Sequence, residues 1–562
     1  MCRQPATQQP MPDLDVSAAI KEALARYRAG DLARAEQVYR AIVAAAPDAL
    51  HYADLAIVLE AQGKYEEAAA TYQEAMRRNP REARPHYNLG NLLRDRGRID
   101  EAIACFQQAI ALNPRYADAY NNLGRLLVER GRLEESMAHF RQTIALAPGF
   151  AHGHNNLGTA LHSLGRLEEA IRCYRRAIEL KPDYAEAYSN LGSAHLRLDQ
   201  LDAAIENCRK AANISPAFPD VHYNLANACR SALLMAEAIE HYERAISLRP
   251  DYGGYHWNYS MAMLLNGDYA KGWREYEWRW QGCLELKSGK PAFSRPEWKG
   301  EDLSGQTVLL YREQGLGDVI QFIRYAPMVA GRGARVVVAC QPELIRLLGA
   351  VDGVFGVVSI EQPLPPFDMH CPLLSLPLIF NTTLATIPSG VPYMSADGAL
   401  TEAWRKRIGP DAAFKVGLIW GGWAGNQIDA RRSIPLADFA PLARLPGVTF
   451  YSLQKGQHAA QSPPAGMSLS DWSGELTDFA DTAALVDNLD LVISVDTAGA
   501  HLAGAMGKQV WLLNRFESEW RWLLEREDSP WYPSMRIFRQ PRPGDWRTVM
   551  AKVREALERR AS

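Results

Sequence analysis

An acid, a hydroxyl and an imidazole stand close together in VISVDTAGAHLAGAMGKQVWLLN, the stretch from Val492 to Asn514. The apolar run before Asp496 predicts a buried strand, and the small residues after Thr497 predict a helix that starts at Ala498. Thr497 and His501 are four residues apart and would share one helix face. Free amides and the helix dipole favour a phosphate at such a helix start, and Asp496 would accept from a ribose or sugar hydroxyl. The alternative is a capped helix that carries an ordinary surface histidine.

A second strand-to-helix turn contains two glycines and an acid. TVLLYRE is followed by QGLGDVIQFIRYAP, which runs from Gln314 to Pro327. Gly315 and Gly317 permit a tight turn that brings backbone amides close to an anion. Asp318 would stand at the helix start, where its simplest role is to cap the helix.

Three further predicted strand ends carry polar side chains. After KVGLIW, Arg431 and Arg432 offer forked donors that suit a phosphate, although a solvated basic loop is the alternative for each. After VTFYS, Gln454 could pair with a base edge and Lys455 with a phosphate. His370, in FDMHCPLLSLP, is a reserve candidate for a general base.

These side chains require parallel sheets to bring them together. Short apolar runs alternate with helical stretches from Thr307 onward, which predicts strands joined by crossover helices. A seam of Pro and Gly residues divides this region into domains at 307–400 and 401–562, and residues 284–306 read as a linker. In such sheets a ligand binds at the carboxyl ends of the strands.

The first half of the sequence repeats itself every 34 residues, with a turn residue at Gly97, Gly131 and Gly165 and a proline closing each unit. This spacing is typical of tetratricopeptide repeats, in which paired amphipathic helices must stack to bury their apolar faces. It predicts an all-α superhelix of about eight helix pairs over 17–283, after a disordered tail at 1–16. In the last helix, an aromatic stripe at Tyr269, Trp273, Tyr276 and Trp280 is expected to dock onto the next domain.

One polar position recurs throughout this array. Asparagines separated by 34 residues occupy the first helix of successive units, at Asn88, Asn122, Asn156, Asn190, Asn224 and Asn258. A column of asparagines can pair with the backbone of an extended peptide whatever its sequence. The column resembles the asparagine ladder of eukaryotic O-GlcNAc transferases, although asparagine is common here in tetratricopeptide repeats generally. A protein or peptide acceptor in the groove is therefore one of two open interpretations.

Composition excludes several other classes of protein. A net charge of -3 gives no overall attraction to nucleic acid or to an anionic membrane. Eight scattered cysteines without a CxxC pair argue against a disulfide framework or a zinc site. No apolar run approaches the roughly 20 residues of a membrane span, and residues 1–16 lack the apolar segment of a signal peptide. We therefore expect a cytoplasmic protein.

The stretch that ends at Asn514 resembles the signature of glycosyltransferase family 9, the lipopolysaccharide heptosyltransferases. That family has a similar Asp-Thr-Gly-x-x-His run before a Gly-Lys-Pro turn, with Ala498 and Gln509 here replacing the Gly and the Pro. The GLGDVI segment resembles the family's glycine turn, whose aspartate is a proposed catalytic base and corresponds to Asp318. Arg432 lies where the family keeps a basic residue for the diphosphate.

The resemblance spans about 307–557 and implies a GT-B fold, in which two Rossmann-like domains face a cleft. It also implies inverting transfer from a nucleotide-diphosphate sugar to an acceptor. No metal or other cofactor is expected, because the only DxD triplet, Asp13-Leu14-Asp15, lies in the tail. The acceptor is expected to be a protein that the repeats present. A lipid-linked or surface-glycan acceptor, and a non-catalytic scaffold with a degenerate transferase domain, remain as alternatives.

Overall fold

The computed structural model describes residues 14–286, 288–410, 413–423, 425 and 429–561 of the 562-residue chain. Its internal contacts divide it into two compact units, Met1–Ser215 and Pro216–Ser562. The predicted tail at 1–16 falls mostly outside the described residues; within them, Asp15 caps a helix that begins at Val16.

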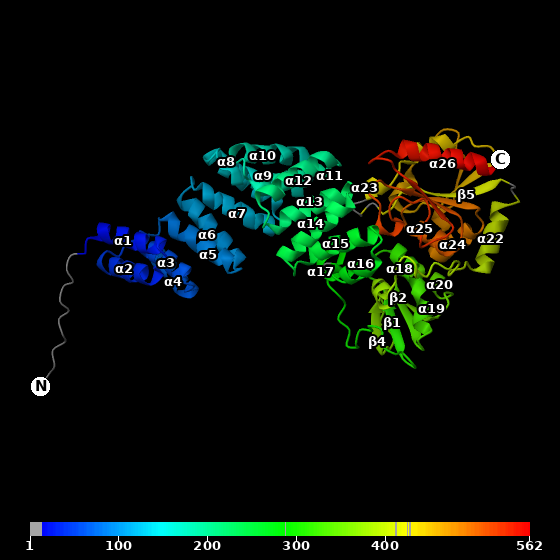
Figure 1. Ribbon diagram of the computed structural model, residues 1–562, viewed down its shortest axis with the longest axis horizontal. Coiled ribbons are helices and arrows are strands. Elements are labelled where there is room, and N and C mark those ends of the chain that lie inside the picture. Colours follow the sequence, from blue (N-terminus) through cyan, green and yellow to red (C-terminus); the bar gives the residue numbers. More distant parts are fainter. Residues whose placement is uncertain (1–13, 287, 411–412, 424, 426–428, 562) are drawn as a thin grey trace. The chain divides into compact units, whose positions relative to one another are not determined.

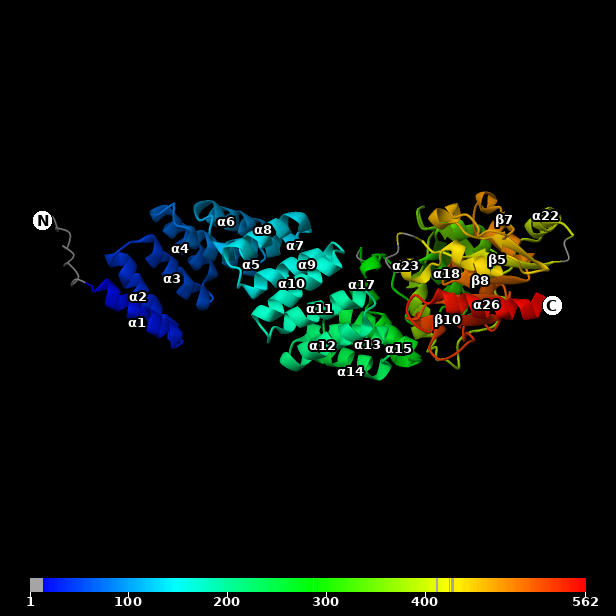
Figure 2. The ribbon, with the colours of Figure 1, turned by 90° about the horizontal axis from the view of Figure 1, so that it is seen from above.

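The first unit consists of helices only. Consecutive helices lie side by side in chain order in both views (Figures 1 and 2). They are α1 (Val16–Arg28), α2 (Leu32–Ala45), α3 (Ala49–Ala61), α4 (Tyr65–Arg78), α5 (Ala83–Asp95), α6 (Ile99–Leu112), α7 (Ala117–Glu129), α8 (Leu133–Leu146), α9 (Ala151–Ser163), α10 (Leu167–Leu180), α11 (Ala185–Arg197) and α12 (Leu201–Ile214).

The repeat period explains both the turns and the packing. The turn after the first helix of a pair adopts a positive φ, 73° at Gly131 and 77° at Gly165. Asp199 and Leu233 adopt the same geometry without a glycine, at 56° and 61°. Within a pair the helices approach closely: a Cβ on Gly158 would lie 2.6 Å from the ring of Tyr174. Glycines facing aromatic rings thus allow close packing in three pairs, α5–α6, α7–α8 and α9–α10, while in α11–α12 Gly192 faces Cys208.

The second unit begins with more helices of the same kind. These are α13 (Pro219–Ser231), α14 (Met235–Leu248), α15 (Gly253–Leu265) and α16 (Tyr269–Tyr276), followed by the short α17 (Arg279–Gly282). The described residues thus contain eight helix pairs, from α1–α2 to α15–α16, as the period predicts.

The aromatic stripe of α16 packs onto the rest of the second unit. The Trp273 ring lies 5.2 Å from that of Trp520, at an interplanar angle of 88°. The Tyr269 hydroxyl accepts from Nε1 of Trp531 at 3.1 Å. Trp280 lies in the separate helix α17, because α16 ends at Tyr276, and it packs against a core cluster that includes Tyr311. The prediction that the stripe docks onto the following domain is confirmed.

A four-stranded parallel sheet follows, in the order β3-β2-β1-β4. Its strands are β1 (Thr307–Tyr311), β2 (Arg335–Cys340), β3 (Val354–Ser359) and β4 (Met369–Pro372). Its helices are α18 (Leu316–Phe322), α19 (Ala326–Ala330), α20 (Ile345–Leu348) and α21 (Leu376–Ile379).

A six-stranded parallel sheet completes the unit, in the order β10-β9-β8-β5-β6-β7. Its strands are β5 (Phe414–Ile419), β6 (Val448–Ser452), β7 (Leu469–Asp471), β8 (Leu491–Val495), β9 (Val510–Asn514) and β10 (Met535–Arg539). Its α-helices are α22 (Gly398–Ile408), α23 (Asp429–Arg432), α24 (Phe479–Asp487), α25 (Ala498–Ala505) and α26 (Trp546–Ala561). Its 3-10 helices include η5 (Leu436–Leu442), which precedes β6, and η8 (Trp520–Trp522), which follows β9. The second half is therefore an α/β region with two parallel sheets.

Candidate active site

Asp318 stands one turn into α18, just beyond the carboxyl end of β1. Its Oδ2 accepts from the Gly315 amide at 2.8 Å, so the aspartate does cap this helix. Its Oδ1 accepts from Nη2 of Arg521, which lies 203 residues further along the chain. Asp318 therefore belongs to a site as well as to a helix cap.

The start of α25 lies at the carboxyl end of β8, as the sequence predicts. Thr497 is its N-cap residue and makes no side-chain capping bond; its hydroxyl lies 3.2 Å from Oγ of Ser494. Among the described residues, nothing accepts a hydrogen bond from the amides of Ala498 or Gly499. Two backbone donors are thus available to an anion at this helix start.

His501 is buried, with only 5% of its surface exposed, so it is not an ordinary surface histidine. Its Nδ1 lies 2.9 Å from the Tyr532 hydroxyl, and its ring stacks on Trp522 with the centroids 5.4 Å apart. Its Nε2 is 4.0 Å from Oδ1 of Asp496. Burial, and then the positive charge of Arg521, hold the pKa of His501 well below its usual range. The imidazole is therefore neutral near pH 7.

The two predicted motifs meet because Gly317 has no side chain. A Cβ at this position would lie 3.0 Å from Cδ2 of His501 and 3.5 Å from the Cα of Ala498. Helices α18 and α25 consequently pack directly against each other (Figure 1). Elements that follow strands of two different sheets thus bring Asp318 and the 496–501 segment to one place.

Arg521 lies at the centre of the site that Asp318 and the 496–501 segment form. Its Nη2 donates to Asp318, its Nη1 to Oε1 of Glu519, and its Nε to Oε1 of Gln321. Its guanidinium also lies over the Trp520 ring, 4.2 Å from the centroid. One buried cation therefore faces the acidic cluster, which we define as Asp318, Asp496 and Glu519.

Burial and the neighbouring charges shift the pKa values of two carboxyl groups beside Arg521, those of Asp318 and Glu519. Burial raises the pKa of Asp318; Arg521 and the Gly315 amide oppose this, and the negative charge of Asp496 adds to it. Burial raises the pKa of Glu519 to about 7, with Arg521 opposing and Asp496 and Asp318 adding to the rise. Buried carboxyl groups of raised pKa are typical of sites that move protons.

Glu519→Gln is expected to flatten the pH dependence of stability. The pKa of Glu519 is about 7 in the folded chain against an ordinary 4.5, so the folded state holds this proton more tightly. The stabilisation is complete below about pH 4.5 and is lost as the pH rises toward 7. Each pKa unit is worth about 1.4 kcal/mol, so the wild type should lose a few kcal/mol over this range. Urea denaturation at several pH values measures how the unfolding free energy changes with pH in the wild type and in Glu519→Gln. An equal dependence in both proteins would contradict the raised pKa of Glu519.

The two predicted phosphate-binding arginines lie in α23 and are already paired. Arg431 is 3.4 Å from Oε2 of Glu517, and 34% of its side chain is exposed. Glu517 also accepts from Nη2 of Arg230, in α13, at 3.1 Å. Arg432 is 3.3 Å from Oδ1 of Asp429. Both arginines are thus oriented by carboxylates, and α13 shares in orienting Arg431.

Gln454 and Lys455 are positioned differently from what the sequence suggests. The Gln454 side chain accepts from the amides of Trp420 and Gly421 and donates to the carbonyls of Gly421 and Lys455. These four bonds fill its hydrogen-bonding capacity, so Gln454 would have to exchange some of them to pair with a base edge. The Lys455 ammonium donates to two backbone carbonyls, those of Ser473 and Leu476, each at 2.6 Å.

The structure places His370 within a strand and not at the strand end that the sequence predicts. It is the second residue of β4, pairs with Leu309 in register, and is 5% exposed. Its ring is 4.6 Å from that of Phe293 and 5.7 Å from that of Tyr311. The end of a four-residue strand could not be located from the sequence. His370 packs against aromatic rings in the interior of the sheet.

Most asparagines of the ladder bind neighbouring repeats. Asn122 donates to Oδ1 of Asn91 at 2.9 Å, and Asn156 donates to Oδ1 of Asn121 at 2.8 Å. Asn190 donates to Oδ1 of Asn155 at 3.0 Å, and Asn258 donates to the Tyr223 hydroxyl at 2.8 Å. These side chains tie successive repeats together, which limits what they can offer to a peptide.

Sequence reasoning missed Glu519 and Arg521. A usable signal was present, because the charged segment RFESEWR begins immediately after β9, at a strand's carboxyl end. The tryptophans of the following segment pack in the interior: Trp520, Trp522 and Trp531 are at most 2% exposed.

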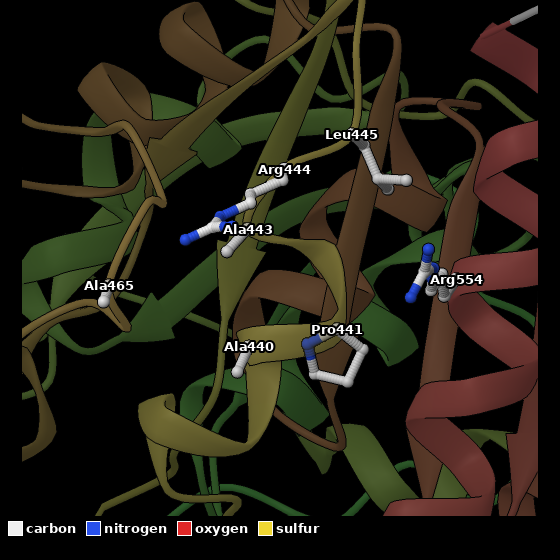
Figure 3. Close-up of a pocket in the computed structure, with 7 residues that line it drawn as sticks. All are labelled: Ala440, Pro441, Ala443, Arg444, Leu445, Ala465 and Arg554. Atoms are coloured by element: carbon white, nitrogen blue, oxygen red, sulfur yellow. The ribbon is translucent and has the colours of Figure 1, made fainter.

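Two other features of the described residues bear on the site. A hollow of about 340 Å³ between η5 and α26 is lined by Arg444 and Arg554, and none of the predicted site residues lines it (Figure 3). In the described part of the chain, no group of three or more His, Cys, Asp or Glu residues is arranged to hold a metal ion. No helix in that part is long and apolar enough to cross a membrane.

Comparison with known families concerns the repeats. Tetratricopeptide-repeat models match residues 48–115, 87–149, 185–218 and 219–252, and a further TPR-repeat model matches 158–199. Protein FlbA of Caulobacter vibrioides is 29% identical over 327 residues, which are 53% of this chain and 54% of FlbA. The chain therefore spans about half the length of this curated relative.

Several solved structures are similar to part of the chain. The Cut9–Hcn1 hetero-tetramer of the APC/C is 20% identical, with 43% of this chain and 48% of that chain covered and a TM-score of 0.38. YrrB, a TPR protein with an unusual peptide-binding site, is 25% identical, with 33% and 95% covered and a TM-score of 0.28. MamA from Desulfovibrio magneticus RS-1 is 24% identical, with 30% and 96% covered and a TM-score of 0.29. Tetratricopeptide repeats run throughout the N-terminal half of this chain.

Proposed function

We propose that residues 307–562 form a metal-independent GT-B glycosyltransferase that takes a sugar from a nucleotide-diphosphate donor. The observation that carries the proposal is the contact between α18 and α25, which joins Asp318 to the Asp496–His501 helix start. Both helices follow the carboxyl ends of parallel strands, where α/β sheets bind ligands. The resemblance of both segments to family 9 glycosyltransferases supports the same assignment.

The site residues divide between donor and acceptor chemistry. The free amides at the start of α25, together with Arg431 and Arg432, would stabilise the leaving diphosphate. Asp318 would take the proton of the acceptor hydroxyl as its oxygen bonds to the anomeric carbon and the carbon–diphosphate bond breaks. The raised pKa of Asp318 makes it a stronger base than an exposed aspartate. Arg521 and Glu519 would position this carboxylate.

A panel of nucleotides and nucleotide sugars tests the proposal by thermal shift. A ligand at about a hundred times its Kd adds about 2.7 kcal/mol to the stability of the folded state. We expect one nucleotide class to raise the Tm, and Asp496→Ala to abolish the rise.

Asp318→Asn separates binding from catalysis. We expect it to retain the thermal shift and to lower donor turnover, measured as release of the nucleoside diphosphate, by about 10²–10⁴-fold. A matched control is Asp302→Asn, an exposed carboxylate before β1. If no ligand shifts the Tm, the proposal fails.

A non-catalytic repeat scaffold is the second candidate. It is favoured by the matches to the repeat models and by the prior engagement of Arg431, Arg432 and Gln454 within the protein. A thermal shift without measurable turnover in either wild type or Asp318→Asn would select this candidate. If turnover is detected, the class of molecule that receives the sugar distinguishes a protein acceptor from a glycan acceptor.

A further inference from the structure

A groove of about 460 Å³ opens among the first three helix pairs, in the first compact unit. It is lined by residues of α1, α3, α4 and α5 and of the turn that follows α5. Six of the lining side chains carry the argument, and they are Tyr27, Glu60, Tyr65, Asn88, Asp95 and Arg96. We call this the Asn88 groove.

Asn88 differs from the other ladder asparagines in its side-chain bonding. Asn122, Asn156 and Asn190 each donate to a neighbouring repeat. Among the residues that the structure describes, none forms a hydrogen bond with the Asn88 side chain, which is half-buried in the groove wall. Its donor and acceptor are both available there, so it can bind a peptide backbone in the two-point manner expected of the ladder.

Glu60 gives the groove its charge preference. Its Oε2 accepts from the Tyr72 hydroxyl at 3.1 Å, and no lysine or arginine of the described residues forms an ion pair with it. Burial raises the pKa of Glu60; the Tyr72 hydrogen bond and the positive charge of Arg94 oppose this, and the negative charge of Asp95, with which Arg94 forms its ion pair, adds to it. A cation beside Glu60 would relieve this unfavourable environment.

The other charges of the groove are already matched. Asp95 accepts from Nε of the adjacent Arg94 at 2.8 Å. The guanidinium of Arg96 lies over the Tyr65 ring, 4.6 Å from its centroid. Glu60 is thus the one of these charged groups without an ionic or cation–π partner among the described residues, and the Tyr27 ring lines the same wall.

We propose that the Asn88 groove binds an extended peptide, with Asn88 on its backbone and one lysine or arginine side chain seated against Glu60. The carboxylate supplies a charge-assisted hydrogen bond and the tyrosine rings supply a surface for the cation. The site belongs to the first unit alone, so it does not depend on the proposed transferase activity. It would select a partner or acceptor protein by a basic residue in an extended segment.

A random nonapeptide library displayed on phage tests the proposal with the full-length protein as bait. We expect the peptides that wild type enriches, and Glu60→Gln does not, to share a lysine or arginine at one position. The best sequence is then synthesised with a fluorescein label, as itself and with that residue replaced by glutamine.

Fluorescence anisotropy should give at least a tenfold weaker affinity for the glutamine peptide, for Glu60→Gln and for Asn88→Ala. The losses of affinity caused by the glutamine peptide and by Glu60→Gln should not be additive, because each change removes the same ion pair. Glu134→Gln, an exposed carboxylate on α8, is the matched control. Far-UV melting curves check that the variants fold.

Enriched peptides without a shared basic residue, or equal binding by wild type and Glu60→Gln, would overturn the proposal. A selection that yields no peptide preferring wild type over Glu60→Gln would overturn it as well.

Discussion

Replacing Arg521 by methionine is expected to lower the unfolding free energy of the second unit by about 3–5 kcal/mol at pH 8. Arg521 is 8% exposed and donates to Asp318 and Glu519, while the charge of Asp496 also acts on it. Methionine fills a similar volume without charge, so the variant leaves the acidic cluster buried with no counter-ion. The cost is therefore mainly electrostatic, with a smaller loss from the contact with Trp520.

The pH dependence distinguishes an electrostatic cost from a packing cost. Without Arg521 the folded-state pKa values of Asp318 and Glu519 should rise further above their unfolded values. Such carboxyl groups bind protons more tightly in the folded state than in the unfolded state. The cost of ionising them in the folded state therefore lowers the unfolding free energy as the pH rises, and this cost disappears toward pH 4 to 5. The destabilisation should consequently be much smaller at about pH 5 than at pH 8.

Tryptophan fluorescence in urea measures this unit selectively, because all 14 tryptophans lie at or after Trp257. The matched control is Arg526→Met, whose ion pair with the exposed Asp528 is only partly buried and should contribute no more than about 1 kcal/mol. An equal loss at both pH values would show that Arg521 acts by packing alone.

The repeat array was predictable because its determinants are local. A period of 34 residues places each turn, each small residue and each ring that it contacts within one helix pair. The turns at Asp199 and Leu233 keep the positive φ without glycine, so the surrounding pairs impose the geometry there. The number of helix pairs could therefore be counted from the sequence.

The predicted positions of the two motifs at strand ends also follow from local rules. A strand followed by Gly317-Asp318, or by Asp496-Thr497, must turn at the carboxyl edge of a parallel sheet. The partners at that edge do not follow from local rules. Asp318 and Arg521 are separated by 203 residues, and they meet only because tertiary packing brings α18 and η8 together.

The sequence also could not predict which polar side chains are already hydrogen-bonded or buried within the protein. Gln454 follows a strand and carries the right groups for a base edge, yet four backbone groups already occupy it. His370 follows a similar pattern, but the register of β4 against β1 places it inside the sheet. In both cases the residue type indicated chemistry, and the three-dimensional arrangement of the neighbouring backbone assigned a structural role.

The junction between α16 and the acidic cluster leads to the second large effect. Trp273→Ala is expected to destabilise the second unit by about 3–5 kcal/mol, the usual range for a buried tryptophan. Trp273 is 1% exposed, and its ring packs edge-on against Trp520 and Phe322. Its Nε1 has no hydrogen-bond partner among the described residues, so the loss is one of packing and not of a hydrogen bond.

The same truncation should disturb the proposed donor site, because Trp520 lies between Glu519 and Arg521 in the chain and under the Arg521 guanidinium. A cavity beneath Trp520 would loosen the segment that holds Asp318. We therefore expect Trp273→Ala to weaken any nucleotide-induced thermal shift, and Trp273→Phe to restore part of both losses. Trp423→Ala, at a side chain 75% exposed, should change the free energy of unfolding by less than about 0.5 kcal/mol. If Trp273→Ala unfolded at the wild-type midpoint, the last repeat helix would be a neighbour of the site and not a support for it.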